Sequence, residues 1–428
     1  MNASNWFKFT AGIAALASIA TVVAPAAPAH AANPRSFAGG SLVVERMGDG
    51  TATLSSTAAQ ISVLEVTTTG SLTQTIILPS GTSNPQTDSG SATSDGYLNT
   101  YGGFVSVPGY NVVIGTGTVA SQNAKVNSLL DSTGTVVTRT LFPVGGPSGT
   151  TPGTPAGVSP FSGNNYRSSI ATSGTTFYGV GTASGTPNTG GAWYFNGSAF
   201  TQVSSTASGQ PTNLRVVDIY NNQLYATSAA GTGYGIWSIG SGLPTTAANA
   251  STLAINTGTG SAYGFVMFST GSQGSGVLDL AYIADDRTTL GGGLQKWTLS
   301  GTSWSNSWSV FVSGTVGSPP STLQSGTGVG FAGIRGLAGT YDSVLGASLY
   351  ATTTELSNNR VISIFDSGST QPSTYTTLQS AGSNYAFRGV DLSPVSVPEP
   401  STFAIAALAT LGMAGLIRRR RRAGDSDG

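Results

Sequence analysis

The segment Leu214–Ile239 reads LRVVDIYNNQLYATSAAGTGYGIWSI, and the fold class of the chain can be predicted from it. It contains three short stretches rich in β-branched and aromatic residues, and turn residues such as Asn221-Asn222 separate them. This alternation is typical of consecutive antiparallel β-strands. The body of the chain shows no sustained helical periodicity, so an all-β fold is predicted.

The same pattern of strands recurs along the chain. Corresponding units begin near Arg167, Gly264 and Arg335, and Phe387–Leu392 matches only the first strand of a unit. Units of roughly 40–55 residues with several strands each are typical of β-propeller blades. Residues 33–395 are therefore predicted to form one β-propeller domain, which resembles β-propeller proteins in general.

We expect six blades. Four begin at the units near Arg167, Arg215, Gly264 and Arg335, and a fifth is expected over 104–142. A ring of sheets exposes unpaired edges unless its ends pair, so the sixth blade should combine both ends of the body. It would join the last strand, 387–392, to the segments 41–46, 61–67 and 72–78. Seven blades would require further strands near 143–165 or 311–331.

The N-terminal segment 1–31 is predicted to be a secretory signal peptide. A short region with one Lys precedes an apolar run over 9–23, and Ala29-His30-Ala31 supplies the small-x-small site that signal peptidase cleaves. Cleavage after Ala31 would remove the only His of the chain, and the sequence contains no Cys. Signal peptidase is therefore an expected partner, and the mature body is expected to lack imidazole and thiol groups.

Residues 396–428 form a tail of different composition. It contains Pro398-Glu399-Pro400, a mostly apolar segment over 401–417, and a cationic cluster made of Arg418, Arg419, Arg420, Arg421 and Arg422. The apolar segment would span roughly 26 Å as a helix, close to the ~30 Å hydrocarbon core of a bilayer. A short transmembrane helix is therefore predicted, with the arginines on its cytoplasmic side.

The order of these three parts resembles a PEP-CTERM sorting signal. The resemblance covers only the tail, and it implies that an exosortase-like membrane protease processes the protein in an exopolysaccharide-producing Gram-negative bacterium. It further implies a transient span of the inner membrane before processing, and then a location in the cell envelope, at the cell surface or in the extracellular matrix. A permanent single-span anchor is the alternative interpretation.

The composition of the body restricts its chemistry. Residues 32–396 carry 14 acidic and 11 basic side chains, so nucleic acid is not an expected partner. Common serine hydrolases and metallohydrolases need an imidazole group, which the mature body is expected to lack. Glycoside hydrolysis needs only two well-placed carboxylates, although Glu45, Glu65 and Glu355 are the only glutamates of the body.

Four arginines occupy the same position in their repeats, namely Arg167, Arg215, Arg335 and Arg388. A shared repeat position favours a structural role, in which these arginines pair with the backbone or with Asp218 and Asp391. The alternative is a ring of arginines that faces a ligand, as in the six-bladed sialidases. The Ser-x-Asp-x-Gly-x-Thr-Trp motif of that family is absent from the sequence.

Two further groups of residues are candidates for binding. Trp304 and Trp308 lie in a turn-rich stretch, where they would either stack on sugar rings or pack in the core. Asp285-Asp286 and Asp49 lie near glycines, but without the alternating acid spacing of a calcium loop. They are interpreted as solvated turns, and no metal or cofactor is predicted.

These observations favour an exported β-propeller that is not an enzyme and acts by binding or as a structural component. Extracellular polysaccharide is a candidate partner. The competing hypothesis is an extracellular carbohydrate-active enzyme, a glycosidase or a lyase. Two or three carboxylates in the central channel, with a Tyr or Arg facing them, would favour the enzyme, whereas a channel lined by Ser, Thr and aliphatic residues would favour binding.

Overall fold

The computed structural model describes residues 34–394, apart from 123, 145–158, 232, 290, 314–320 and 326–331. The predicted signal peptide and sorting tail therefore lie outside the described residues. Strands dominate the described part, whose only helical element is the 3-10 turn η1 (Val119–Ser121). In that part no helix is long and apolar enough to cross a membrane, and the predicted span 401–417 is not included in it. The prediction of an all-β fold is confirmed.

Four antiparallel sheets follow one another along the chain. The first consists of β9 (Tyr166–Ala171), β10 (Phe177–Gly181), β11 (Gly191–Phe195) and β12 (Phe200–Gln202). The second consists of β13 (Leu214–Tyr220), β14 (Gln223–Ala230), β15 (Gly233–Ile239) and β16 (Ser251–Asn256). The third consists of β17 (Ala262–Phe268), β18 (Leu280–Asp285), β19 (Gly293–Ser300), β20 (Ser303–Val312) and β21 (Leu323–Gln324). The fourth consists of β22 (Ile334–Asp342), β23 (Gly346–Thr353), β24 (Arg360–Asp366) and β25 (Thr376–Ser380).

The remaining strands belong to one nine-stranded sheet. Its first part joins β26 (Ala386–Leu392), β1 (Leu42–Met47), β2 (Ala58–Val66) and β3 (Leu72–Ile77). Its second part joins β5 (Asn99–Tyr101), β6 (Phe104–Tyr110), β7 (Lys125–Leu130) and β8 (Val136–Leu141). The short strand β4 (Thr87–Ser89) pairs with both β2 and β6, and so it links the two parts.

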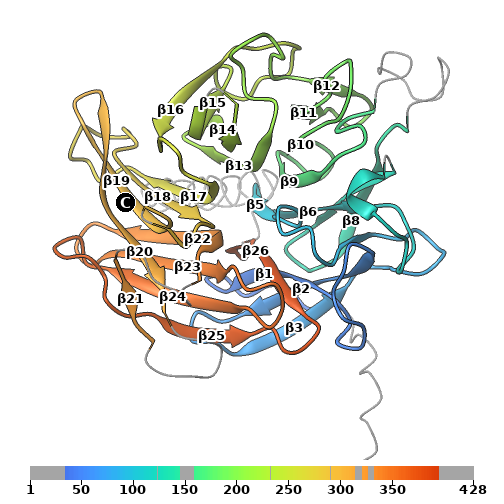
Figure 1. Cartoon of the computed structure of the whole chain (residues 1–428), viewed down its shortest axis with the longest axis horizontal. Helices are drawn as coiled ribbons and strands as arrows, with labels where there is room; N and C mark the ends of the chain where they lie inside the picture. Colours follow the sequence, from blue (N-terminus) through green and yellow to red (C-terminus); the bar gives the residue numbers. More distant parts are fainter. Residues whose placement is uncertain are drawn as a thin grey trace, which may run out of the picture. The chain divides into compact units, whose positions relative to one another are not determined.

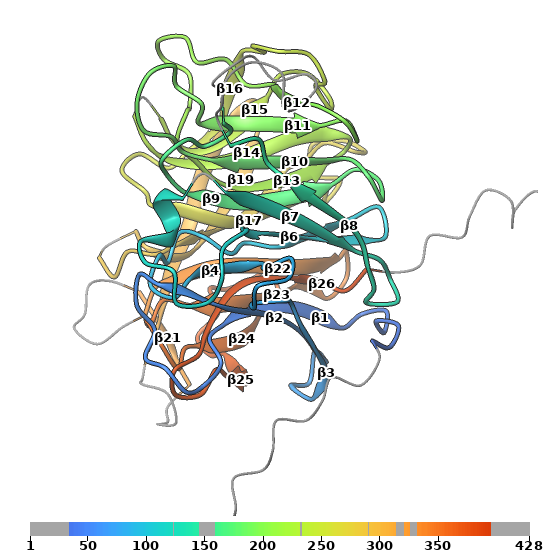
Figure 2. The same cartoon turned by 90° about the vertical axis from the view of Figure 1, so that its right-hand side faces the viewer.

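The two ends of the described chain meet in this sheet. β1 and β26 are antiparallel neighbours, with Leu42 opposite Leu392 and Met47 opposite Ala386. Both views show β26 beside β1 (Figure 1, Figure 2). The prediction that the last strand of the body pairs with its first strand is confirmed.

The first strands of successive sheets contact one another in a closed sequence. β9 contacts β6 and β13, β13 contacts β17, β17 contacts β22, β22 contacts β26, and β26 contacts β5. Figure 1 shows these strands around a common centre, with the other strands of each sheet farther out. The arrangement is that of a β-propeller, as the repeats predict.

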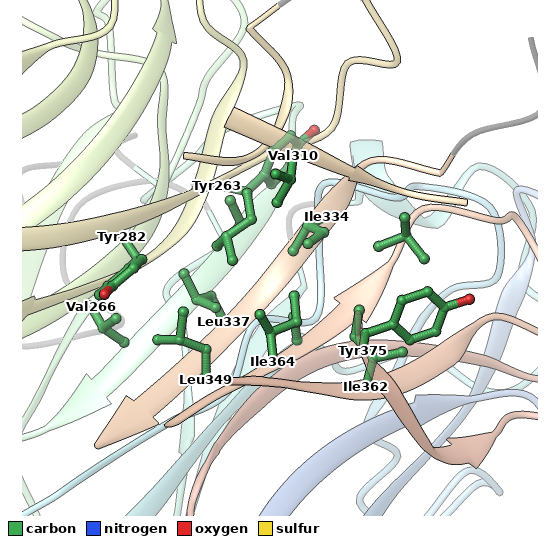
Figure 3. Close-up of a cluster of buried hydrophobic side chains, with 14 of the residues drawn as sticks. Tyr263, Val266, Tyr282, Val310, Ile334, Leu337, Leu349, Ile362, Ile364 and Tyr375 are labelled. Carbon is green, nitrogen blue, oxygen red and sulfur yellow. The ribbon is translucent and has the colours of Figure 1, made fainter. Parts of the chain in front are cut away.

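Each sheet is covered by a neighbouring sheet on both faces, so its strands are apolar on both faces. All six residues of β18 are buried. Tyr282 and Ala284 belong to a cluster shared with β22 to β24, whereas Ala281 and Ile283 belong to a cluster shared with β15 and β16. Figure 3 shows part of the first cluster, in which Tyr282 lies near Val266 of its own sheet and Leu337 of the neighbouring sheet. Full burial of one such aliphatic side chain stabilises the fold by about 1.5–3 kcal/mol.

Candidate functional site

The repeated arginines lie at irregularities of the innermost strands. The pairing of β13 with β14 shifts register between Leu214 and Val217, and that of β22 with β23 shifts between Ile334 and Leu337. Arg215 and Arg335 fall within these shifts, so each sits in a β-bulge. Bulges change the direction in which a side chain points. The pairing of β17 with β18 has the same irregularity between Ala262 and Phe265. Tyr263 occupies the corresponding position there, and it was not recognised from the sequence because it is not an arginine.

Two of the four arginines bond to the segment at the start of the next sheet along the chain. Arg167 donates to the side chain of Asn213 and to the carbonyl of Leu214 at 3.2 Å. Arg215 donates to the hydroxyl of Ser261 at 2.7 Å. These partners stand at the start of the next innermost strand, so each arginine joins two successive sheets.

Arg388 and Arg335 also form hydrogen bonds or an ion pair within the fold, but their partners do not lie at the start of the next innermost strand. Arg388 donates to the carbonyl of Gly90 at 2.9 Å, in the segment between β4 and β5. Arg335 forms an ion pair with Asp286, with 3.1 Å between Nη2 and Oδ2, and donates to the carbonyl of Thr354 at 3.3 Å. All four guanidinium groups are thus engaged within the fold.

The predicted partners Asp218 and Asp391 accept their hydrogen bonds from other groups. Asp218 accepts from the Tyr220 hydroxyl at 2.6 Å and from the amide of Ile219 at 2.7 Å. Asp391 accepts from the amide of Thr100 at 2.6 Å and from its neighbour Leu392 at 2.7 Å. Pairing of the repeated arginines with these two aspartates is therefore not what the structure shows, because each arginine binds the other partners described above.

Aromatic rings pack against two of the four repeated arginines. The guanidinium carbon of Arg215 lies 4.1 Å from the ring centre of Tyr263, and that of Arg335 lies 5.6 Å from the same ring. The ring of Tyr97 lies 5.6 Å from that of Tyr263. Cations over aromatic faces are attracted by the ring quadrupole, typically by about 0.5–2 kcal/mol. Arg215, Arg335 and the two tyrosine rings therefore pack together.

A second connection between sheets comes from the Leu-Tyr-Ala-Thr segments of β14 and β23. The hydroxyl of Thr227 accepts from the amide of Val216 at 3.2 Å and donates to the carbonyl of Tyr263 at 2.8 Å. The hydroxyl of Thr352 donates to the carbonyl of Arg388 at 2.7 Å. The repeated threonine thus satisfies bulged backbone groups and joins neighbouring sheets, a role that the repeat alone did not indicate.

Three carboxylic acids, Glu45, Asp88 and Asp95, form a buried acid cluster close to Arg388. Burial raises the pKa of Glu45 to about 8, although the positive charge of Arg388 partly offsets the effect. Burial also raises the pKa of Asp88, and the nearby Asp95 and Glu45 add to this. Each member is at most 1% exposed, so the acid cluster is closed to a polymeric substrate.

The raised pKa of Glu45 gives a testable pH dependence of stability. Below about pH 4.5 the folded and unfolded chains both hold this proton, whereas between about pH 4.5 and pH 8 only the folded chain keeps it. Unfolding then releases a proton, so the free energy of unfolding falls as the pH rises through this window, by at most about 1.4 kcal/mol per pH unit. Glu45→Gln should remove this contribution, which denaturant unfolding at several pH values would measure.

The matched control is Asp342→Asn. Asp342 is exposed and backbone hydrogen bonds lower its pKa, so it is ionised throughout this pH window and its replacement should not change the slope. The same pH dependence in the wild-type chain and in Glu45→Gln would contradict the prediction.

Asp218 on β13 and Asp391 on β26 form a separate pair of neighbouring acids. Burial raises the pKa of Asp218 to about 8, with a further contribution from the charge of Asp391. Burial likewise raises the pKa of Asp391, to about 7. Two neighbouring carboxyl groups with raised pKa values can hold a proton at neutral pH, which is a property of acid catalysts. This pair, with the hydroxyl of Tyr220, is the arrangement that would favour an enzyme.

The strand β5 occupies the centre of the propeller. Figure 1 shows it among β6, β9, β13 and β26, and it contacts all four. Asn99 donates to the hydroxyl of Ser168 at 2.8 Å and to the carbonyl of Ser169 at 3.1 Å. Thr100 provides the amide that Asp391 binds. The chain itself therefore fills part of the axis, where a propeller often holds its ligand.

The structure corrects the interpretation of two other groups. Trp304 and Trp308 lie in strand β20 and not in a turn, and both are partly buried against core clusters. Asp285 is buried and forms an ion pair with Arg287 at 2.7 Å, so it is not in a solvated turn. Asp49 accepts from the amide and hydroxyl of Thr51, both at 2.8 Å, as expected of a turn. In the described ranges no three acidic or histidine side chains are grouped to hold a metal ion.

The fold and the axis define an all-β protein of the β-propeller type. Residues 396–422 match the PEP-CTERM protein-sorting motif, which confirms the resemblance drawn from the tail. This motif implies export and sorting by an exosortase, with a location at the cell envelope or surface. The motif itself lies outside the described residues.

Three solved structures are similar to this chain at low identity. A candidate 6-phosphogluconolactonase from Bacteroides uniformis is 13% identical over 83% of this chain and 84% of its own, with a TM-score of 0.38. Its counterpart from Bacteroides fragilis is 14% identical over 78% and 82%, with a TM-score of 0.40. YCF48 bound to D1 peptide is 11% identical over 82% and 88%, with a TM-score of 0.37. No curated protein matches the sequence, and no activity is transferred from these structures.

Proposed function

We propose that this protein is an exported six-bladed β-propeller that acts at the cell surface or in the extracellular matrix by binding or as a structural component, and not by catalysis. The nine-stranded sheet counts as two blades, one of β26 with β1 to β3 and one of β5 to β8, and the four other sheets supply the rest. β1 and β26 then close the ring.

The observation that best supports a non-catalytic role is that strand β5 of the chain itself fills part of the propeller axis. β5 lies at the centre, and Asp391 holds it through the amide of Thr100. The four repeated arginines are engaged in hydrogen bonds or an ion pair within the fold. An active site needs groups that are free to meet a substrate in an open cavity. The axis instead holds groups that bind one another.

The tail supports a route to the cell surface. Signal peptidase would remove 1–31, the segment 401–417 would span the inner membrane transiently, and an exosortase-like protease would process the chain near Pro398-Glu399-Pro400. Extracellular polysaccharide is the partner that this route would make available. A propeller delivered by this route would lie at a polysaccharide-rich surface.

One experiment tests the role directly. Antibody labelling of intact producing cells should find the protein at the surface, and the purified full chain should sediment together with the exopolysaccharide of those cells without shortening it. Absence from the surface would contradict the proposed function. Shortening of the polymer would contradict the non-catalytic role.

A carbohydrate-active enzyme is the second candidate function, and the pair Asp218 and Asp391 is the observation that favours it. Any shortening of the polymer should then disappear in the double variant Asp218→Asn, Asp391→Asn. The variant Asp49→Asn, in an exposed turn, is the matched control. Shortening that persists in the double variant would remove this pair from consideration.

Replacement of Arg418–Arg422 by Ser should weaken membrane retention and sorting. The arginines provide the positive charge that holds the tail on the cytoplasmic side. The melting temperature should not change, because no described strand includes these residues. Cell fractionation and thermal unfolding would measure the two effects. The control replaces Asp425 and Asp427, which lie beyond the matched motif. An unchanged distribution of the arginine variant would refute the role of the cluster.

A further inference from the structure

A pocket of about 410 Å³ lies between the sheet of β17 to β21 and the sheet of β22 to β25. We call it the interblade pocket, and its lining includes Tyr282, Lys296, Asp366, Asp279, Tyr341 and Ser343. Its volume falls within the range of about 300–1,000 Å³ that is usual for small-ligand sites. None of these residues belongs to the axis described above.

Fixed polar groups form one wall of the interblade pocket. The Nζ atom of Lys296 lies 2.8 Å from Oδ2 of Asp366, and the Tyr282 hydroxyl donates to the same oxygen at 2.6 Å. Asp366 is 1% exposed and Lys296 is 8% exposed, so their positions are set by packing. An ammonium group has three donors and a phenol oxygen can also accept. The wall therefore offers a ligand both donors and an acceptor at fixed positions.

A second wall is held by Asp279. Its carboxylate accepts from the amide of Thr270 at 2.7 Å, from the Thr270 hydroxyl at 2.9 Å and from the amide of Gln273 at 3.1 Å. These bonds order the segment that leads into β18. With Asp279 and Asp366 against Lys296, the charged side chains of the pocket sum to −1, which disfavours an anionic ligand.

An aromatic ring contributes apolar surface to the pocket. Tyr341 is partly buried and stacks on Phe268, with 5.8 Å between ring centres and 28° between ring planes. This contact restrains the ring while leaving part of it in the lining. A ring face of this kind can pack against the C–H face of a sugar, while hydroxyl groups meet the polar wall.

We propose that the interblade pocket binds a neutral sugar unit of a polysaccharide. The polar wall, the excess of negative charge and the restrained aromatic ring together fit an uncharged polyhydroxylated ring. The inference rests on the proposed binding function and specifies its site and the chemical class of its ligand.

The test uses Ser343→Trp in the full chain, purified in detergent micelles. Ser343 is exposed in the turn between β22 and β23, so a large side chain there should occlude the pocket without disturbing the core. Ser198→Trp is the matched control, because Ser198 is exposed in the turn between β11 and β12. The probes are malto-, cello-, laminari- and mannohexaose, with an alginate hexasaccharide as the acidic comparison. Titration calorimetry should show that at least one of the four neutral hexasaccharides binds to the wild type and to Ser198→Trp. The affinity of Ser343→Trp for the same hexasaccharide should be at least tenfold lower.

A second variant, Tyr341→Leu, removes the ring while retaining an apolar side chain, and it should also lose at least tenfold in affinity. Equal affinity of Ser343→Trp and the wild type would overturn the site while leaving the proposed function intact. Preference for alginate would overturn the neutral class of ligand. Absence of binding to all five probes would overturn the inference, whereas the proposed function is decided separately by the surface labelling of producing cells.

Discussion

A chain that ends at Tyr385 is expected to aggregate, whereas a chain that ends at Val395 is expected to be secreted, soluble and folded. The shorter chain lacks β26, which pairs with β1 along its length and contacts β22. It also loses Phe387 and Val390, whose burial contributes about 1.5–3 kcal/mol each. Together with the strand pairing, this loss is comparable to the whole stability of a typical domain, about 5–15 kcal/mol.

Exposed strand edges explain why aggregation should follow. Without β26, the edge of β1 presents unpaired backbone groups that can pair with another chain. The longer chain keeps every described strand and loses only the sorting tail. Expression of both truncations from the same vector, followed by size-exclusion chromatography and thermal unfolding, would compare them. Equal solubility and equal melting temperature would show that β26 does not close the ring.

Replacement of Arg388 by Met should destabilise the fold by about 3–5 kcal/mol, the usual cost of removing one partner from a buried charged group. Arg388 is 2% exposed, donates to Gly90, and lies close to Asp88 and Asp95. Its loss removes the positive charge that partly offsets the raised pKa of Asp88 and frees the segment between β4 and β5. Chemical denaturation at pH 7 would measure the change.

Arg215→Met is the matched comparison, because Arg215 has the same repeat position but is only partly buried. Its hydrogen bond to Ser261 and its contact with the Tyr263 ring should be worth about 1–2 kcal/mol together. The effect of the double variant Arg388→Met, Asp88→Asn should differ from the sum of the two single effects, because the charge of Arg388 acts on Asp88. If Arg215→Met kept its melting temperature and lost ligand binding, a ligand-facing role of the arginines would replace the structural one.

Local sequence patterns were sufficient for the fold class and for the position of the repeated residues. Stretches of β-branched residues bounded by turn residues predicted the strands, because this pattern lies entirely within the few residues of each strand. The repeats placed four arginines at one position, and all four lie at register shifts of innermost strands. The assignment of Trp304 and Trp308 to a turn failed because Ser and Asn in β20 face outward and hide the strand.

The acid cluster could not be predicted from the sequence. Glu45 on β1, Asp88 on β4 and Asp95 before β5 meet near Arg388 on β26 only after the two ends of the body have paired. The interblade pocket depends in the same way on β18 and β19 from one sheet and β24 from another. No contiguous pattern records which sheets become neighbours.

An all-β repeat and a sorting tail could both be predicted from the order of residues, because both are contiguous signals: a period of strands, and Pro-Glu-Pro followed by an apolar segment and arginines. The contacts of the repeated residues depend on how distant strands pack together. This packing directs Arg167 and Arg215 to the next sheet and leaves Asp218 and Asp391 to bind β5 and their own strands. The physical reason is that a bulge and a closed ring set the direction of a side chain, and both arise only when distant strands pair.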